Sequence, residues 1–483
     1  MKTLIALTFF LTTYHQLLMS QVEKWQAEVD KFVTHKDFSS ASIGISISEI
    51  RTGRTIASHD AERSLIPAST LKILSSYAAL HTAGKDYRYQ TEFLVRSSGV
   101  SDSTLWGDLM VIGKGDPSFL SSLLPENTNL GALADTLVQA LLTKGIRTIS
   151  GTVRVNSDFI KDIPENPEWL WYDLGNYYGS GYYGFNAYEN AAMITLSIPD
   201  APDQICEILD VVPACLWENY CSEAVTVETG PFVPLYLLGT SSHRIYTVHG
   251  RLQYGKDKTI SLAAAVPNPS ETFECILKDA LKEKGILFRD SLVPGFFPKD
   301  EMIYVHPSQT LDKLAKRALG RSVNLYAEAF LHLGGWIWNG DPDREMALDK
   351  MRKFYLGKSG HKAGVRILDG SGLSPKNRIT AQIMTDILNE IAADKKRKYF
   401  VQLLPDVSQS GSLASRLSRK TRLKEKFRLK SGSMEGVRAY AGYIMNGSDP
   451  QYSISLMINN YDCSGDEIKK HISDFLIHLS QLK

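Results

Sequence analysis

Alternating apolar and polar positions near both ends of the chain predict the strands of one sheet. Residues 43–49 and 55–58 predict a hairpin that turns at Arg51-Thr-Gly-Arg54. Residues 439–445 and 452–459 predict two more strands close to the other end. The two ends of the chain therefore contribute strands to the same sheet.

Helical periodicity predicts two helices that pack on this sheet. Residues 468–482 carry one apolar face and predict a closing amphipathic helix. A second helix begins at Ser69 and ends at Gly84. It should be internal, because its apolar residues cover more than one face: Leu71, Ile73, Leu74, Tyr77, Ala78 and Leu80.

The middle of the chain is too long to be a loop. About 250 positions separate Lys72 from Ser322, so the segment between them must fold by itself. Short apolar alternations make this inserted segment mostly β, and they lie at 91–96, 109–112, 152–155 and 259–265.

Composition limits the class of protein. At 483 residues the chain predicts two or three domains. Its 54 Lys and Arg are balanced by 53 Asp and Glu, without a long basic run, which argues against a nucleic-acid partner.

The N-terminus is typical of an exported protein. Lys2 precedes a short apolar run that is too short to span a bilayer, and Ser20 is a small residue before a cleavage point. We expect residues 1–20 to be a signal peptide, with an amphipathic helix of the mature fold as the alternative. The sequence shows no other membrane-spanning candidate. Because a signal peptide directs export across the inner membrane, we expect the protein in the periplasm or cell envelope.

Five cysteines leave at least one thiol unpaired in any disulfide scheme. Cys206, Cys215 and Cys221 lie close together in sequence, so one local disulfide bridge among them is possible. Their spacing does not match a zinc site, and we expect no metal and no organic cofactor.

Ser69-Thr-Leu-Lys72 is the strongest candidate for chemistry. Serine and lysine three positions apart share one helix face, which brings a hydroxyl and an amine together. A buried lysine must be paired or neutral, and a neutral amine can take the proton of a nucleophilic serine. Ser-x-x-Lys occurs again at Ser359 and Ser480, but without the apolar helix.

Two further motifs supply the partners that serine acyl transfer needs. Ser322-Val-Asn324 offers a hydroxyl and a carboxamide. Lys430-Ser431-Gly432 lies on a predicted strand and offers an ammonium, a hydroxyl and a position without a side chain. The same triplet at 358–360 lacks the strand alternation, so we favour Lys430.

These three motifs in this order form the S-x-x-K, S-x-N, K-[ST]-G signature of penicillin-binding proteins and serine β-lactamases. More narrowly, the chain resembles the class C low-molecular-mass penicillin-binding proteins, which are D-alanyl-D-alanine carboxypeptidases and endopeptidases. It departs from them at Val323, where Asp is commoner, and at Ser431, where Thr is commoner. Other matching stretches lie at 115–118, 169–190, 322–328, 369–374 and 411–416.

The resemblance implies an α+β fold: a transpeptidase-like domain, related to penicillin-binding proteins and β-lactamases, in which helices flank an antiparallel sheet. Its serine peptidase domain would comprise 21–87 and 301–483. A large mostly-β insertion would occupy 88–300, with a nested subdomain at about 160–255.

The resemblance also implies the reaction. Ser69 would form an acyl-enzyme with peptidoglycan stem peptides or cross-bridges, and β-lactams would inhibit it. Catalysis would involve Ser69, Lys72, Ser322, Asn324 and Lys430, and substrate binding would involve Ser431, Gly432, Ser433, Met434, Trp169 and Tyr177.

Several alternatives stay open. The aromatic stretch at 169–190 would either pack the insertion against the catalytic domain or wall the substrate cleft with Trp169 and Tyr177. Asp116 is expected to be a turn residue. A serine β-lactamase and a non-catalytic peptidoglycan-binding protein are the rival functions.

Overall fold

The computed structural model describes residues 22–255, 257–289, 299–359, 364–394, 396, 398–407 and 425–482. The expected signal peptide at 1–20 lies outside the described residues. The described chain forms two compact units. The terminal unit comprises the chain up to His81, Ala315–Ser322 and the chain from Leu348 onward, and the inserted unit comprises Thr82–Leu314 and Val323–Ala347.

An antiparallel sheet in the order β18-β19-β20-β1-β2 forms the centre of the terminal unit. The hairpin and the C-terminal strands predicted from alternation are present, and β1 pairs with β20, which joins the two ends of the chain. The strands are β1 (Ser42–Glu49), β2 (Thr55–His59), β18 (Phe427–Met434), β19 (Val437–Asn446) and β20 (Asp449–Asn459), and a separate pair is β3 (Ser64–Leu65) with β17 (Ile379–Thr380).

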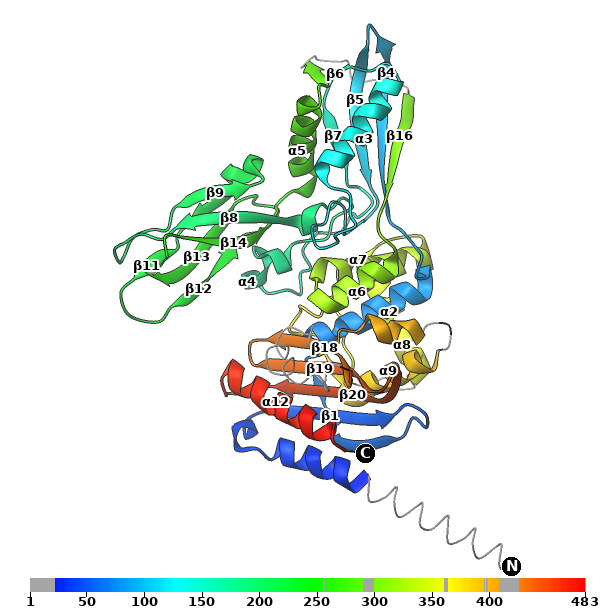
Figure 1. Ribbon diagram of the computed structural model, residues 1–483, viewed down its shortest axis with the longest axis vertical. Helices are drawn as coiled ribbons and strands as arrows, with labels where there is room; N and C mark the ends of the chain where they lie inside the picture. The colour runs from blue at the N-terminus through cyan, green and yellow to red at the C-terminus, as the bar shows by residue number, and fades with distance from the viewer. Residues whose placement is uncertain are drawn as a thin grey trace, which may run out of the picture. The chain divides into compact units, whose positions relative to one another are not determined.

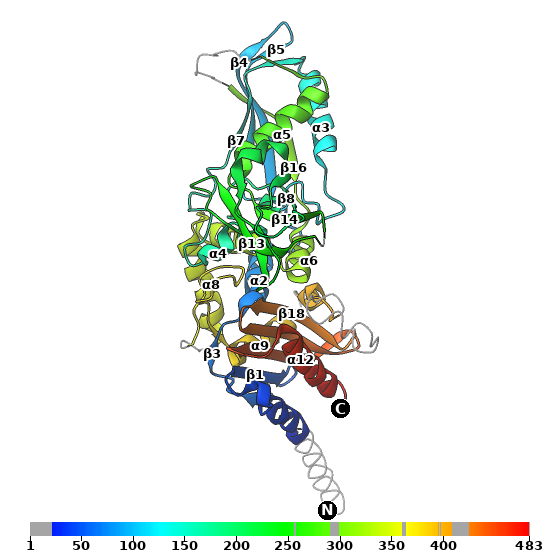
Figure 2. The same ribbon diagram turned by 90° about the vertical axis from the view of Figure 1, so that its left-hand side faces the viewer.

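Helices cover both faces of this sheet. The apolar side of β1 packs in one core with α12 (Gly465–Leu479) and with the helical residues 22–33, which lie side by side in Figures 1 and 2. On the other side, Ser46 of β1 hydrogen-bonds Thr385 of α9 (Ala381–Ala393). Alternate residues of a strand point to opposite faces, so β1 is buried between two helical layers.

The start of the internal helix differs from the prediction. Ser69 lies in a 3₁₀ turn, η2 (Ala68–Leu71), and α2 (Lys72–Ala83) follows it directly. Gly84 comes next with φ +83°, so the helix ends where the sequence predicted. The terminal unit also includes the 3₁₀ helices η1 (Lys36–Phe38) and η6 (Lys398–Leu403) and parts of the α-helices α6 (Leu311–Arg321) and α8 (Arg344–Ser359).

The inserted unit is rich in short strands, as predicted. One mixed sheet has the order β15-β6-β5-β4-β16 with β7 beside β5, a second has the order β14-β8-β9, and a third joins β10, β11 and β12 to β13. The strands are β4 (Gln90–Ser101), β5 (Thr104–Gly113), β6 (Thr148–Ser150), β7 (Val153–Asn156), β8 (Ala191–Ser197), β9 (Ile208–Val212), β10 (Tyr220–Ser222), β11 (Val225–Val227), β12 (Val233–Leu238), β13 (Tyr246–Gln253), β14 (Thr259–Ala265), β15 (Leu287–Arg289) and β16 (Lys299–Pro307).

Helices in the inserted unit complete two buried cores. One core forms between the first sheet and two long helices, and the other lies among the strands of the second and third sheets. The helices are α3 (Leu130–Thr143), α4 (Trp171–Leu174), η3 (Tyr177–Gly179), η4 (Tyr188–Asn190), η5 (Ala214–Asn219), α5 (Pro269–Glu283) and α7 (Asn324–Asn339).

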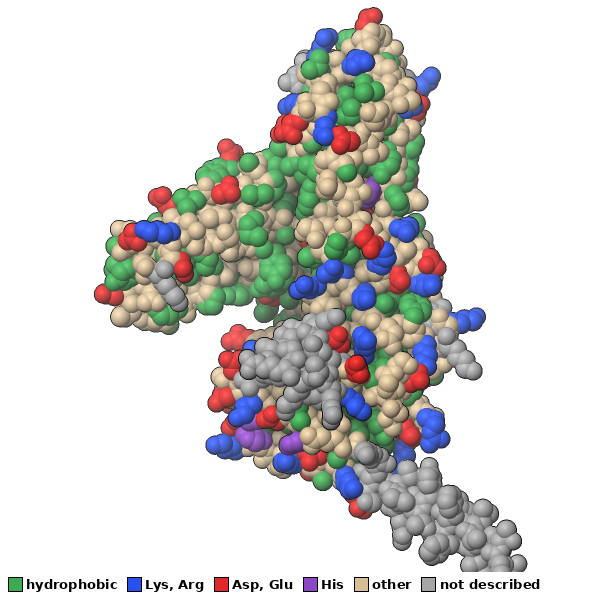
Figure 3. Space-filling model, viewed as in Figure 1, with side chains coloured by type: hydrophobic (Ala, Val, Ile, Leu, Met, Phe, Trp, Pro, Cys, Tyr) green, Lys and Arg blue, Asp and Glu red, His purple; other side chains and the backbone are tan. Residues whose placement is uncertain are grey.

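The surface agrees with the balanced composition. On the face in Figure 3, Lys and Arg side chains are interspersed with Asp and Glu. Within the described ranges, no helix has the length and apolar character needed to cross a membrane. Cys206, Cys215 and Cys221 are free thiols, so the local bridge left open by the sequence is not formed.

Candidate active site

Ser69 and Lys72 meet at the junction of η2 and α2. Lys72 is fully buried, and its Nζ donates a hydrogen bond of 2.8 Å to Ser69 Oγ. In a 3₁₀ turn, residues i and i+3 eclipse one another, so the tight turn aligns the two side chains. The spacing in the sequence therefore identified a real pair, although the turn is not α-helical.

A loop after α8 holds the amine of Lys72 from the other side. Lys72 Nζ also donates to Ser371 O at 2.6 Å. The buried carboxylate of Asp369 fixes this loop by accepting from the backbone N–H groups of Gly372 and Ser374, both at 2.7 Å. The 369–374 stretch, for which no role was predicted, thus orients Lys72 through a backbone carbonyl.

A second lysine reaches the same region from β18. Lys430 is buried, and its Nζ donates to Ser322 Oγ at 2.9 Å and to Ser431 O at 2.7 Å. Burial holds the pKa of Lys430 well below its usual range, and the nearby charge of Lys72 lowers it further. Two amines thus lie close together, each hydrogen-bonded to a serine hydroxyl.

Gly432 lets β18 approach the serine turn. A Cβ atom at this position would lie 2.6 Å from Pro67 O and 3.0 Å from the backbone nitrogen of Ser69. Only a residue without a side chain fits, as expected for the third position of the Lys-Ser-Gly triplet. Ser433 and Met434 continue the strand beyond it, and Ser433 Oγ accepts a hydrogen bond from Arg438.

Two residues at the site adopt backbone angles that are rare outside glycine. Ala68, directly before the serine, has φ +46°, and Ser322 has φ +58°. Such conformations cost free energy and persist where the surrounding structure enforces them, often at functional sites. These backbone angles set the directions in which the side chains of Ser69 and Ser322 point.

Asn324, Trp169 and Tyr177 belong to the inserted unit. Asn324 is the first residue of α7, and its Nδ2 donates to Tyr178 O at 2.7 Å. Trp169 is buried, which favours a packing role for this ring, whereas Tyr177 is more than half exposed. The aromatic stretch is therefore in direct contact with Asn324 through its backbone.

Asp116 has the turn geometry expected from the sequence. Its Oδ1 accepts from the N–H and the hydroxyl of Ser118, at 2.8 and 2.7 Å. Burial raises the pKa of Asp116 to about 6, against the lowering effect of the two Ser118 hydrogen bonds. The 411–416 stretch, which also matched the resemblance, lies outside the described residues.

Comparison with known families decides the relationship. The sequence pattern of the D-Ala-D-Ala carboxypeptidase 3 (S13) family matches residues 25–480. The chain belongs to this family. The family match spans both units, so it includes the inserted unit in addition to the serine and lysine motifs.

Relatives of known name are similar over nearly the whole chain. The D-alanyl-D-alanine carboxypeptidase DacB of Haemophilus influenzae is 24% identical over 96% of this chain and 93% of its own length. The D-alanyl-D-alanine carboxypeptidase of an Actinomadura species is 22% identical over 92% of this chain and 82% of its own.

Solved structures confirm the α+β fold predicted from the resemblance. The crystal structure of penicillin binding protein 4 (dacB) from H. influenzae superposes with a TM-score of 0.78 at 21% identity and covers 92% of this chain and 97% of that chain. The same protein has been crystallised with a β-lactam, and that structure superposes with a TM-score of 0.71.

Proposed function

We propose that the protein is a serine D-Ala-D-Ala carboxypeptidase, a D,D-endopeptidase, or both, acting on peptidoglycan stem peptides and cross-bridges. The observation that carries this proposal is the double pairing of Ser69 with Lys72 and of Ser322 with Lys430. Membership of the D-Ala-D-Ala carboxypeptidase family supports the choice of substrate.

Acylation would begin with the Ser69–Lys72 pair. Lys72 Nζ takes the proton of Ser69 Oγ, and Oγ attacks the carbonyl carbon of the penultimate D-Ala. The lowered pKa of the neighbouring Lys430 supports a pair of amines that does not carry two charges at neutral pH. The backbone N–H groups of Ser69 and Ser433 would stabilise the oxyanion, a contribution of about 3–4 kcal/mol per donor in comparable sites.

Release of the leaving group would use the second pair. Ser322 relays a proton: it gives its own to the departing amine as the peptide C–N bond breaks and takes one from the two amines, which have received the proton of Ser69. Asn324 holds the substrate amide. Lys430 and Ser431 bind the terminal carboxylate. Water then attacks the ester on Ser69, which frees the shortened peptide and restores the hydroxyl.

The remaining substrate contacts follow the same proposal. Gly432 and Met434 would border the bound peptide along β18. From the aromatic stretch, Tyr177 would contact the substrate, and the buried Trp169 would support that stretch by packing. A β-lactam amide would be attacked by Ser69 in the same way as the D-Ala-D-Ala bond. Export by residues 1–20 would place the enzyme in the periplasm or cell envelope, where it meets peptidoglycan.

Release of D-Ala tests the proposal. A synthetic stem peptide ending in D-Ala-D-Ala should lose its terminal residue, and Ser69→Ala should reduce the rate by at least about a thousandfold, because no nucleophile remains. Ser480→Ala is the matched control, since Ser480 has the same Ser-x-x-Lys spacing outside the site. Equal D-Ala release by the Ser69→Ala protein would contradict the proposal.

A further inference from the structure

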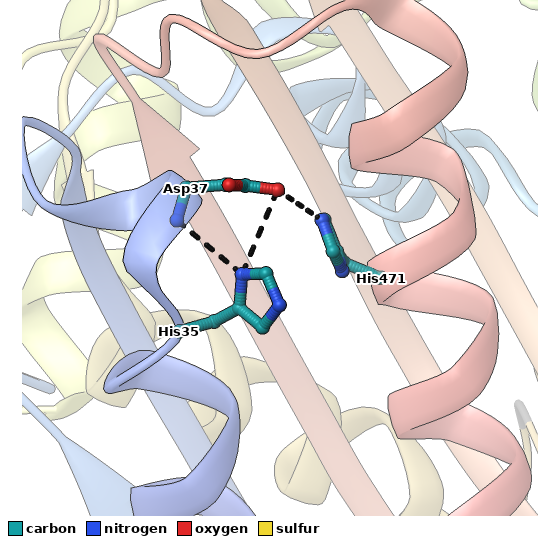
Figure 4. Close-up of side chains that lie close together, drawn as sticks. All are labelled: His35, Asp37 and His471. Carbon is teal, nitrogen blue, oxygen red and sulfur yellow. Dashed lines mark hydrogen bonds and ion pairs between the residues drawn. The ribbon is translucent and has the colours of Figure 1, made fainter.

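Two histidines and an aspartate from opposite ends of the chain converge in the terminal unit. Asp37 lies in η1, His35 is the residue directly before η1, and His471 lies in α12. Figure 4 shows both imidazole rings next to the Asp37 carboxylate. None of the three takes part in the chemistry proposed for Ser69.

We propose that His35, Asp37 and His471 bind a divalent transition-metal ion, with Zn²⁺ as the best match. Two imidazoles and one carboxylate are a common protein ligand set for zinc when a water molecule takes the fourth position. In the described residues, this is the one group of at least three His, Cys, Asp or Glu whose ligand atoms lie this close together.

The distances are close to those of a bound ion. His471 Nε2 donates a hydrogen bond of 2.8 Å to Asp37 Oδ2, and His35 Nδ1 lies 3.7 Å from the same oxygen. A metal ion would take the place of the proton between His471 and Asp37, which is released on binding. Ligand atoms around a tetrahedral zinc ion with bonds of about 2.0–2.1 Å are separated by about 3.3 Å. The two distances lie on either side of this value, and all three ligand atoms lie within 4.8 Å of one another.

The nitrogen of His35 that faces the carboxylate already acts as an acceptor. The backbone N–H of Asp37 donates to His35 Nδ1 over 3.3 Å, which is long for a hydrogen bond. A lone pair held by so weak a bond is available to a metal ion after a small ring rotation. The two rings face each other closely, with centroids 4.1 Å apart.

Packing holds the three groups in place. Phe38 packs edge-on against the His471 ring at 5.5 Å and is itself buried in the core beneath α12. Phe32 stacks on Phe475 of α12 at 4.5 Å, which fixes the chain before η1 against the helix. Ligands carried on such a packed layer lose little freedom on binding an ion.

Charge around the cluster also suits a cation. Asp37 supplies a carboxylate beside the two imidazole rings. An adjacent cavity of about 290 Å³ leaves room for a water ligand. The cavity lining carries two lysines and two carboxylates, whose formal charges cancel: Lys31, Lys470, Glu28 and Asp474.

A bound ion would tie η1 to α12, and so the N-terminal part of the chain to its C-terminal helix. Because the unfolded chain does not bring His35 and His471 together, binding would favour the folded state. The predicted effect is a rise in the melting temperature of the protein with Zn²⁺ that depends on all three ligands.

Calorimetric titration of the metal-stripped protein with Zn²⁺ tests the site. We expect one ion per chain in the wild type and an affinity at least about tenfold weaker in His471→Ala and in His35→Ala. His478→Ala is the matched control, because His478 lines the same cavity but pairs with Glu28 at 3.2 Å, and it should bind as the wild type does.

A second variant keeps the test decisive if His471→Ala does not fold. Asp37→Asn preserves the shape of a partly exposed side chain and removes its charge, so it should fold, by circular dichroism, and still bind Zn²⁺ more weakly. Absence of saturable Zn²⁺ binding in the wild type would overturn the proposal. So would a loss of Zn²⁺ affinity in His478→Ala as large as the loss in His471→Ala and His35→Ala. Metal binding is measured without substrate, so neither result depends on the proposed peptidase activity.

Discussion

At the scale of single residues, the buried amines of Lys72 and Lys430 predict how acylation depends on pH. The pKa of Lys430 is lowered by burial and by the charge of Lys72, so the two amines do not both carry a proton at neutral pH and Lys72 can be the neutral member of the pair. As pH falls through this lowered value, a second proton enters the pair, and Lys72 can no longer accept the proton of Ser69. Acylation by a fluorescent penicillin should slow about tenfold per pH unit in acid.

That acidic limb is separable from unfolding. Circular dichroism over the same pH range should show an unchanged fold. An acylation rate that stays constant while the protein remains folded would contradict the proposed role of the two amines.

Asp116 predicts a pH dependence of stability rather than of activity. Its folded pKa of about 6 lies above the ordinary value of 3.8, so the fold favours the protonated carboxyl. This contribution is complete below pH 3.8 and is lost as pH rises to about 6, by up to about 3 kcal/mol. In Asp116→Asn, the free energy of unfolding should lack this decline.

Denaturant unfolding between pH 4 and 7 measures the effect. The control is Asp210→Asn, which changes an exposed carboxylate and should keep the decline of the wild type. Identical pH profiles for wild type and Asp116→Asn would contradict the assignment.

Single-residue chemistry was predictable where it depends on local spacing. Ser69 and Lys72 meet because one turn of chain separates them, and no distant contact is needed to see it. The second acceptor of Lys72, Ser371 O, lies about 300 positions away, and nothing in the matching 369–374 stretch indicated that its backbone would contact Lys72. The left-handed φ of Ser322 is likewise imposed by the fold.

At the scale of elements, the approach of β18 to η2 is the contact on which the site depends. Gly432→Ala would place a methyl group 2.6 Å from Pro67 O and 3.0 Å from the Ser69 nitrogen, so the strand or the turn must move. We expect penicillin acylation to slow by about a hundredfold, because displacements near 1 Å at a reacting centre have this effect.

Gly320→Ala in α6 is the matched control. A Cβ atom there meets nothing within 4 Å, so the acylation rate should not change. Equal rates for Gly432→Ala and the wild type would show that the close approach of β18 to η2 is not needed.

The elements themselves were predictable in proportion to their periodicity. The strands at both chain ends place large apolar residues on one face and small or polar residues on the other, and the predicted positions agree with β1, β2, β19 and β20. The 3₁₀ turn at Ser69 was missed because an apolar run of helical period does not distinguish a 3₁₀ first turn from an α-helical one. The helices α3 and α5 of the insertion were also not predicted, because the short apolar alternations of the insertion favour strands.

At the scale of the whole molecule, each unit has its own buried cores, which predicts two unfolding transitions. Calorimetry of the protein should resolve two peaks. Acylation by penicillin should raise the transition temperature of the terminal unit most, because Ser69, Lys72 and Lys430 all belong to it. A single peak that shifts as a whole would contradict independent units.

Intact-protein mass spectrometry after brief exposure to penicillin shows whether Ser69 is the acylated nucleophile. We expect one persistent adduct of the mass of penicillin on the wild type and none on Ser69→Ala, because the serine next to Lys72 is the acylated nucleophile. Rapid loss of penicillin without an adduct would instead identify a β-lactamase. Neither adduct nor penicillin loss in the wild type would contradict the account and leave a protein that only binds peptidoglycan.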